Sequence, residues 1–205
     1  MTTEKSDTIS IHKKQDVSAG HTTGHLFIVS APSGAGKTTL CHAVRQQYSE
    51  LAYSVSYTTR LPRDGEQHGR DYYYISVQEF ELGIKQGRWA EWAKVHGNFY
   101  GSSARWIDRT LSAGRHILMD IDMQGARQML QCFPQAITIF IMPPSMEILE
   151  QRLRARGTDH LDTISLRLAN AAEEIAQKDI CRHILVNDDL EKAKQQLAAL
   201  IKGYF

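Results

Sequence analysis

The sequence predicts an α/β fold in which a central parallel sheet lies between two layers of helices. Short apolar runs bounded by small residues occur at 26–29, 117–121 and 136–141, with a shorter one at 184–186, as expected for strands buried on both faces. Segments with helical spacing of apolar residues lie between these runs. Strands that alternate with helices are typical of a parallel sheet covered on both sides.

The chain length and charge narrow the class of protein further. A chain of 205 residues is long enough for one domain with a sizeable core. Its 42% hydrophobic and 23% charged residues are typical of a soluble globular protein. Because 24 Lys and Arg almost balance 23 Asp and Glu, the sequence does not predict a broad surface for nucleic acid. We therefore expect neither nucleic acid nor a membrane as a partner.

The first 24 residues differ in composition from the rest of the chain. Residues 1–24 are rich in Thr, Ser, Lys and His and lack the apolar stretch of a signal peptide, so we interpret them as a flexible N-terminal tail. Cys41, Cys132 and Cys181 are widely spaced, with no C-x-x-C pair and no zinc-like grouping with histidine. This usage fits a reducing compartment and predicts a cytoplasmic protein in which each cysteine is a small buried residue.

The predicted elements follow one another from His25 onward. After the first strand we expect helices at 38–48, 103–112, 124–131, 145–156, 162–178 and 188–202. Capping-box spacing marks helix starts at Ser76 with Glu79 and at Asp188 with Glu191. Between 162 and 178 the apolar residues fall on one stripe, so this helix packs on a neighbour through Ile164, Leu168, Ala171 and Ile175.

A segment of different character interrupts the core after the first helix. Residues 53–57, 72–75 and 90–96 have the β-branched and aromatic content of strands, and His96-Gly97-Asn98 is typical of a turn. We expect a small, mostly β insertion at 53–102. The predicted domain covers 25–205, with its core at 25–52, 103–150 and 168–205 and a helical lid at 151–167.

The loop after the first strand predicts a nucleotide-triphosphate site. The Walker A pattern G-x-x-x-x-G-K-[ST] is met at Gly36, Lys37 and Thr38, with Ala31 in place of its first glycine. Between a strand and a helix, such a loop turns backbone N–H groups toward polyphosphate. Lys37 then reaches the terminal phosphates and Thr38 ligates Mg²⁺. The alternative is a glycine-rich turn without a ligand. The predicted ATP-binding residues are Ala31, Pro32, Ser33, Gly34, Ala35, Gly36, Lys37, Thr38 and Thr39.

Two further groups of charged residues are candidates for the same site. Asp120 ends an apolar strand, which is the position of a Walker B carboxylate, so we expect it to hold Mg²⁺ through water. The alternative is that this carboxylate orders a nearby Arg or Lys side chain. In the loop after residue 59, Pro62 and Gly65 favour a turn in which Arg60 and Arg63 converge on a small anion. For these arginines alone, a solvated surface loop would be the commoner explanation.

Several motifs, taken in order, resemble those of the guanylate kinases. The segments are Ser56 to Glu66, Gly69-Arg70-Asp71-Tyr72, Gly97-Asn98-Phe99-Tyr100-Gly101-Ser102 and Asp120-Ile121-Asp122-Met123-Gln124-Gly125. Together with the phosphate loop they are far more specific than a Walker A pattern alone. The resemblance runs from about Leu26 to the end of the chain and implies a P-loop nucleoside monophosphate kinase.

The resemblance also implies roles for individual residues. Positions that hold the GMP phosphate are matched by Arg60, Arg63, Tyr72 and Tyr100. Positions around guanine are matched by Ser56, Glu91, Ser102 and Asp122. Gly101 lies between Tyr100 and Ser102 and is included in the predicted GMP site. Asn187 matches a position near adenine, although a helix cap explains it equally well. Arg152, Arg156 and Arg167 resemble arginines of a mobile lid that folds over the transferring phosphoryl group, whereas we expect Arg154 to be solvated.

The implied reaction transfers a phosphoryl group from ATP to GMP, and by extension to dGMP, with Mg²⁺ as cofactor, in guanine nucleotide salvage and recycling. Two alternatives use the same scaffold. A ribose bisphosphate kinase should lack the guanine set, which this chain has. A non-catalytic guanylate-kinase-like interaction domain should have a degraded phosphate loop, whereas here Gly36, Lys37 and Thr38 are present.

Overall fold

The computed structural model describes residues 23–95, 97–155 and 160–205, and its core is a parallel sheet. Five strands lie in the order β2-β7-β1-β8-β9. Every neighbouring pair runs parallel, which confirms the predicted fold class. The strands are β1 (Leu26–Ser30), β2 (Ala52–Tyr53), β7 (Ile117–Asp120), β8 (Ile137–Met142) and β9 (His183–Val186).

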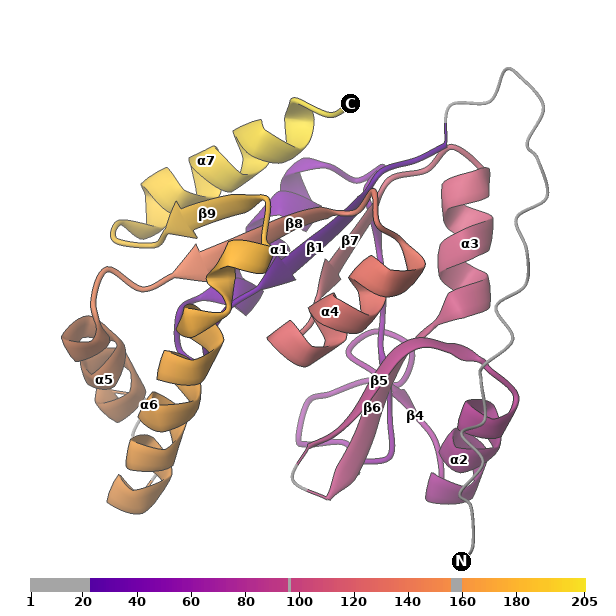
Figure 1. The fold of residues 1–205 in the computed structure, drawn as a ribbon, viewed down its shortest axis with the longest axis horizontal. Helices are drawn as coiled ribbons and strands as arrows, with labels where there is room; N and C mark the ends of the chain where they lie inside the picture. Colours follow the sequence, from indigo (N-terminus) through magenta and orange to yellow (C-terminus); the bar gives the residue numbers. More distant parts are fainter. Residues whose placement is uncertain (1–22, 96, 156–159) are drawn as a thin grey trace, which may run out of the picture.

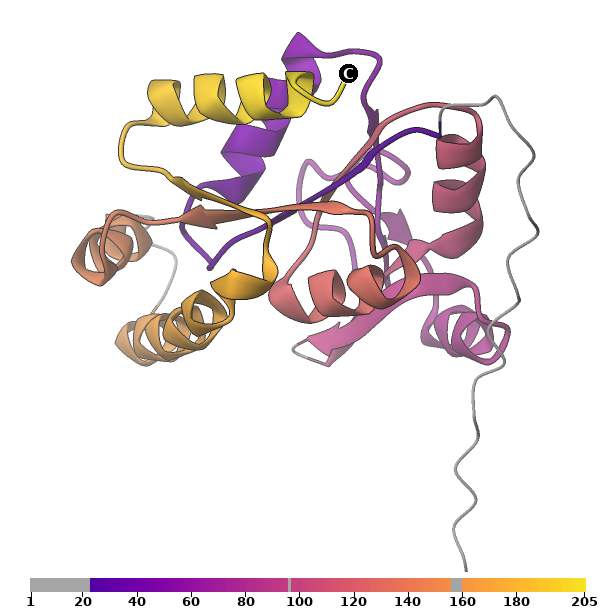
Figure 2. The same cartoon turned by 45° about the horizontal axis from the view of Figure 1, so that its top comes forward.

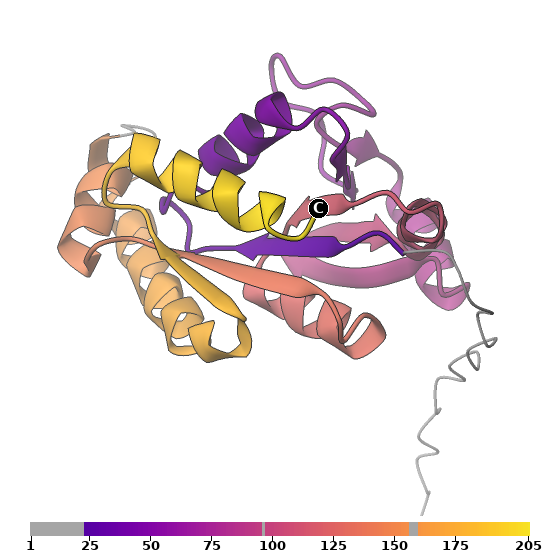
Figure 3. The ribbon, with the colours of Figure 1, turned by 90° about the horizontal axis from the view of Figure 1, so that it is seen from above.

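Helices cover both faces of this sheet (Figures 1 and 3). α1 (Lys37–Gln47) and α7 (Leu190–Lys202) bury Leu40, Val44 and Leu197 against one face. α3 (Ala104–Ser112) and α4 (Met123–Cys132) bury Ile107 and Met129 against the other. Since both faces are covered there, β1, β7 and β8 are continuous buried apolar runs. The edge strand β9 differs, because it buries Leu185 but exposes Ile184 and Val186, so the expectation that 184–186 is buried on both faces is wrong. Among the helices of the described ranges, none is long and apolar enough to cross a membrane.

Two further helices form a smaller packed unit beside the sheet (Figure 2). α5 (Met146–Ala155) and α6 (Leu161–Ala176) join through a cluster that includes Leu149, Leu153, Ile164 and Ala171, with the 3₁₀ turn η1 (Lys178–Ile180) after them. The apolar stripe predicted on the second of these helices is confirmed, because Leu168 packs on this cluster and Ile175 on a neighbouring one.

The insertion forms a second sheet in the order β4-β3-β6-β5. It contains β3 (Tyr57–Thr58), β4 (Tyr73–Tyr74), α2 (Val77–Lys85), β5 (Trp89–Val95) and β6 (Asn98–Ser103). α2 begins with the predicted capping box of Ser76 and Glu79. Its Phe80 is fully buried and stacks between Trp89, at 4.5 Å between ring centroids, and Phe99, at 5.1 Å. This aromatic stack attaches the helix to the sheet.

The structure corrects further details of the sequence prediction. The strand expected at 53–57 is split: Tyr53 pairs with Leu118 of the core sheet, and Tyr57 belongs to the second sheet. The helix start expected at Asp188 lies one residue later, because the side chain of Asp189 caps α7. Cys132, expected to be buried, is exposed at the last residue of α4, whereas Cys41 and Cys181 are buried. Most of the predicted tail and the turn residue His96 lie outside the described residues.

We predict that Phe80→Ala destabilises the protein by about 3 kcal/mol or more, because it removes a fully buried ring and leaves a cavity between two aromatic neighbours. Urea denaturation followed by tryptophan fluorescence measures this change. Val77→Ala on the same helix is the matched control, since Val77 is 44% exposed and its truncation should cost far less. Equal effects of the two substitutions would contradict the packing described for α2.

Candidate active site

The phosphate loop joins β1 to α1 and presents an uncapped helix end. Gly34 and Gly36 both have φ of 95°, a left-handed conformation that favours glycine. Gly36 is the N-cap of α1 and supplies no side-chain acceptor, and the first turn contains no acidic residue. The first amide groups of α1 and the positive end of its dipole are therefore left for an anion.

The loop is supported from behind by β9 and α5. Asn187 is buried, and its Nδ2 donates to the carbonyl of Ala35 at 2.8 Å. A Cβ on Gly36 would lie 2.4 Å from the same nitrogen, so the backbone approaches Asn187 as closely as glycine permits. Arg152 donates to the Asn187 carbonyl at 2.9 Å. Because Asp189 caps the following helix, the cap role considered for Asn187 is wrong, and this residue braces the phosphate loop instead.

Lys37 lies where two cavities meet. Its Nζ donates to the carbonyl of Ile121 at 3.1 Å, just beyond the end of β7. A cavity of about 460 Å³ is lined by Lys37 and the rest of the phosphate loop from Ala31 to Thr39, apart from Ala35. A second cavity of about 220 Å³ is lined by Lys37 and by residues of the insertion. The ammonium group therefore stands between a phosphate-binding loop and a second pocket.

The second pocket contains most of the residues expected around guanine. Of that set, Ser56, Glu91 and Asp122 line the pocket, together with Tyr72 and Tyr100, which were expected to hold the GMP phosphate. Ser102 contributes through Glu91, because its hydroxyl donates to Oε1 of the carboxylate at 2.7 Å. Gly101 allows the close pairing of β5 and β6, since a Cβ there would lie 2.9 Å from the Glu91 carbonyl oxygen. The sequence prediction and the structure therefore place these residues together.

Glu91 is a buried carboxyl group with a raised pKa. Its side chain lies on β5 and the residue is 5% exposed. Burial is the main cause that raises its pKa to about 7; nearby Asp122 raises it further, while the Ser102 hydrogen bond and Lys37 lower it. Asp122 is itself held in place, because its Oδ1 accepts from the amide of Gly125 at 2.7 Å at the start of α4. A buried carboxylate in a pocket is suited to accept adjacent N–H donors.

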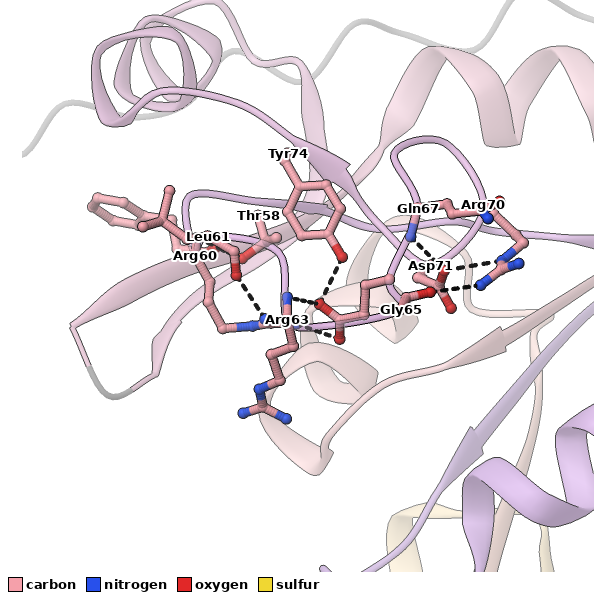
Figure 4. A network of polar contacts seen from close by, with 11 residues as sticks. Thr58, Arg60, Leu61, Arg63, Gly65, Gln67, Arg70, Asp71 and Tyr74 are labelled. Carbon is pink, nitrogen blue, oxygen red and sulfur yellow. Dashed lines mark hydrogen bonds and ion pairs between the residues drawn. The ribbon is translucent and has the colours of Figure 1, made fainter.

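The loop that carries Arg60 and Arg63, here called the arginine loop, is held by a network of polar contacts (Figure 4). Arg60 pairs with Glu66 at 2.9 Å, and the Tyr74 hydroxyl and the Arg63 amide each donate to the other carboxylate oxygen at 2.8 Å. The hydrogen bond from Arg60 is the main reason that the pKa of Glu66 is lowered to about 2. The Arg63 side chain extends away from this network and lines a groove shared with Thr38. Arg60 is thus held by Glu66, a partner that the sequence did not predict, and the convergence of Arg60 and Arg63 on an anion stays a prediction.

The lid arginines of the described ranges reach the phosphate loop. Arg167 donates to the Ser33 hydroxyl at 3.4 Å, and Arg152 reaches the loop through Asn187. Arg156 lies outside the described residues. Arg154 pairs with Glu150 at 2.6 Å, where both side chains are largely solvated, as expected.

Sequence reasoning missed Glu174. This residue of α6 lines the phosphate-loop cavity, and burial, followed by the charge of Asp122, raises its pKa to about 7. Arg167, Ala171 and Glu174 are spaced four and three residues apart, so they share one face of the helix. That spacing could have identified the carboxyl group beside the lid arginine.

Asp120 and Thr38 form a setting that fits Mg²⁺ carried by a nucleotide. Both line a groove of about 430 Å³. Among the described residues no group of three or more His, Cys, Asp or Glu side chains could hold a metal without a substrate. Mg²⁺ needs no such group, because it commonly uses one or two protein oxygens together with substrate phosphates. Oδ1 of Asp120 accepts from the hydroxyl of Tyr53 at 2.5 Å, a partner that the sequence did not predict.

A parallel sheet with an uncapped phosphate loop is joined through Lys37 to a pocket built on an inserted sheet, an arrangement suited to bring a nucleotide polyphosphate and a second ligand together. Comparison with known proteins specifies the family. Residues 23–204 match the family model described as guanylate kinase. This chain belongs to the guanylate kinase family.

Individual relatives agree over most of the chain. Guanylate kinase of Dechloromonas aromatica is 50% identical over 180 residues, which cover 88% of this chain and 89% of the relative. That of Nitrosospira multiformis is 48% identical, covering 89% of this chain and 87% of the relative. The crystal structure of guanylate kinase from Anaplasma phagocytophilum superposes with a TM-score of 0.73 at 30% identity, covering 89% of this chain and 87% of that one.

We predict that Asn187→Ala lowers the free energy of unfolding by about 1–3 kcal/mol, because it leaves the buried carbonyl of Ala35 without its donor. It should also weaken ATP binding, since the phosphate loop loses its brace. Thermal unfolding and calorimetric titration with ATP measure the two effects. Asn170→Ala, on an exposed position of α6, is the matched control. Unchanged stability and ATP affinity in Asn187→Ala would refute the bracing role.

Proposed function

We propose that this chain transfers the γ-phosphoryl group of ATP to GMP and forms ADP and GDP through the residues of the two cavities. The observation that carries this proposal is the position of Lys37, which lines both the phosphate-loop cavity and the insertion pocket. A donor phosphate bound to the loop and an acceptor phosphate in the pocket would meet at this ammonium group. Neither of the two alternative functions is favoured by the family relatives.

On the donor side, residues 31–39 bind the phosphates of ATP through backbone N–H groups, and Lys37 neutralises charge on the terminal phosphates. Asn187 contributes by bracing the loop. Thr38 and, through water, Asp120 hold the Mg²⁺, which supplies charge neutralisation at the ATP phosphates when it is bound. Arg152, Arg156 and Arg167 fold over the transferring group and stabilise its negative charge.

On the acceptor side, Arg60, Arg63, Tyr72 and Tyr100 bind the GMP phosphate. Of these, Tyr72 and Tyr100 line both cavities, which supports an acceptor phosphate bound beside the phosphate loop. Glu66 supports this role, because its ion pair and hydrogen bonds hold Arg60 beside the Tyr72 ring, with 5.3 Å between the guanidinium carbon and the ring centroid.

Ser56, Glu91, Ser102 and Asp122 select guanine. The ring N–H and the exocyclic amine of guanine are adjacent donors, and the Glu91 carboxylate accepts both. Adenine presents a ring acceptor at the same place, which would leave a buried carboxylate unpaired at a cost of about 1–3 kcal/mol. The pocket therefore discriminates against AMP by the loss of a partner for Glu91.

The reaction needs no general base, because the attacking group is a phosphate oxygen that is already anionic near neutral pH. Positioning of the two phosphates and neutralisation of their charge carry the catalysis. Closure of the lid over the site excludes water and limits ATP hydrolysis. We also propose that dGMP is an acceptor and that the protein works in guanine nucleotide recycling. Its cysteines Cys41, Cys132 and Cys181 are unpaired, which supports a reducing compartment such as the cytoplasm.

The direct experiment measures ADP formation from Mg-ATP with a panel of acceptors: GMP, dGMP, AMP, UMP and a ribose bisphosphate. Turnover with GMP and dGMP alone supports the proposal. Turnover with the ribose bisphosphate would indicate the alternative kinase, and the absence of turnover with every acceptor would indicate the non-catalytic alternative. Lys37→Ala, which removes the ammonium group at the junction, should abolish turnover with every acceptor.

We predict that Glu91→Gln loses the preference for GMP over AMP while ATP binding is retained. Glutamine offers an amide donor where guanine also presents donors, so kcat/KM for GMP should fall by about 100-fold. Steady-state kinetics with GMP and AMP, together with calorimetric titration of ATP, measure both effects. Glu81→Gln, an exposed carboxylate on α2, is the matched control. Unchanged discrimination would place the base pocket elsewhere.

We predict that GMP affinity falls as the pH drops through about 7, the raised pKa of Glu91. The binding form is the carboxylate, so below this pH a proton competes with guanine, whereas above it the affinity should level off. Calorimetric titration of GMP at pH values on both sides of the Glu91 pKa measures the profile. Asp122 and Lys37 also interact with Glu91, so the step must be assigned with a variant that lacks the Glu91 carboxyl group. In Glu91→Gln, the dependence of GMP affinity on pH should show no step near pH 7. The same step in this variant would assign it to another group.

A further inference from the structure

Tyr53 contacts the carboxylate at the end of β7. Its hydroxyl donates to Oδ1 of Asp120 at 2.5 Å. In the parallel pairing of β2 with β7, Tyr53 lies opposite Leu118, two residues before Asp120. Because side chains alternate along a strand, Tyr53, Leu118 and Asp120 point to the same face of the sheet. The contact is therefore built into the strand register rather than made by a free surface side chain.

The guanidinium group of Arg45 lies over the ring of Tyr53. β2 has two residues and is the edge strand of the core sheet, so no further strand lies beyond it in the described part of the chain. The guanidinium carbon of Arg45, from the last turn of α1, lies 3.8 Å from the centroid of the Tyr53 ring. A guanidinium stacked on an aromatic face restricts the ring and attracts it electrostatically.

This arrangement leaves the two oxygens of Asp120 in different environments. Oδ1 is committed to the phenol. Tyr53 and Asp120 line the same groove as Thr38, the residue after the phosphate-loop lysine. Without the phenol the carboxylate, which ends its strand, would be free to rotate about its side-chain bonds.

We propose that Tyr53, supported by Arg45, is a positioning residue that fixes the rotamer of Asp120 and leaves one carboxylate oxygen for the hydrated cation that accompanies ATP. This inference rests on the role proposed above for Asp120. It assigns a function to two residues outside the phosphate loop, the guanine pocket and the lid.

The test compares ATP affinity with and without Mg²⁺, measured by calorimetric titration of the full-length protein. The wild-type protein should bind Mg-ATP more tightly than ATP in EDTA. Tyr53→Phe keeps the ring and its contact with Arg45 but removes the hydroxyl, so it should lose about tenfold of this Mg²⁺-dependent gain, the expected worth of one hydrogen bond to a charged group. Its affinity for ATP in EDTA should not change, because the loop amides are intact. Arg45→Gln should give a smaller loss, which Arg45→Lys partly restores.

Tyr48→Phe is the matched control. It removes one tyrosine hydroxyl from a hydrogen bond of 3.3 Å to the Ala198 carbonyl, away from both cavities. It should leave the Mg²⁺-dependent gain unchanged. If Tyr48→Phe and Tyr53→Phe lose the gain equally, the effect is general destabilisation and the proposal is overturned.

A double-mutant cycle separates this inference from the proposed function. If Tyr53 acts through Asp120, Tyr53→Phe should have no further effect on the Mg²⁺-dependent gain in an Asp120→Asn background. Additive losses would overturn the positioning role. Loss of the gain in Asp120→Asn but not in Tyr53→Phe would also overturn it, while leaving the proposed role of Asp120 intact. If Asp120→Asn itself keeps the full gain, that proposed role fails and the positioning role fails with it.

Discussion

The N-terminus of α1 is the constraint around which this protein is organised. Its first amide groups have no side-chain cap, and the loop before it needs left-handed glycines to aim them at one point. Such a loop must be held by other parts of the chain. Asn187 braces it from the end of β9, and α5 packs so closely that a Cβ on Gly34 would lie 2.9 Å from Leu153. The parallel sheet matters because the carboxyl ends of β1, β7 and β9 all lie along the same side of the sheet.

The near-neutral total charge conceals a separation of charge within the site. Lys37 shares its two cavities with carboxyl groups from three elements, namely Glu91 on β5, Asp122 before α4 and Glu174 on α6. Burial raises the pKa of Glu91 and of Glu174, and Lys37 opposes that rise in both. One ammonium group thus faces the phosphate-loop cavity on one side and helps to keep the pocket carboxylates ionised on the other. Its removal would alter both cavities.

The sequence predicted those parts of the site that depend on local pattern. The apolar strands, the phosphate loop and the ordered motifs of the insertion each lie in a short segment, and the structure places them as a unit. The parts that it did not predict depend on contacts between distant segments. Tyr53 and Asp120 are 67 residues apart, and Ala35 and Asn187 are 152 apart. Only strand register and helix packing bring such pairs together, so composition and residue spacing cannot predict these contacts.

The residues proposed to bind GMP lie on two parts of the insertion that are stabilised in different ways. β5, which carries Glu91, is bound to α4 because Gln128 hydrogen-bonds both the amide and the carbonyl of Trp92, at 3.0 and 2.9 Å. Beside it, Ser102 donates to Glu91 and the next residue, Ser103, caps α3. The arginine loop, by contrast, is braced internally through Glu66. The residues proposed to read the base therefore sit on a rigid extension of the core, whereas Arg60 and Arg63 sit on a separately stabilised loop. In such an arrangement, the arginine loop can adjust around a bound phosphate without changing the position of the carboxylate proposed to select guanine. The two roles proposed for the insertion, recognition of the base and contact with the acceptor phosphate, thus fall on separately braced parts of it.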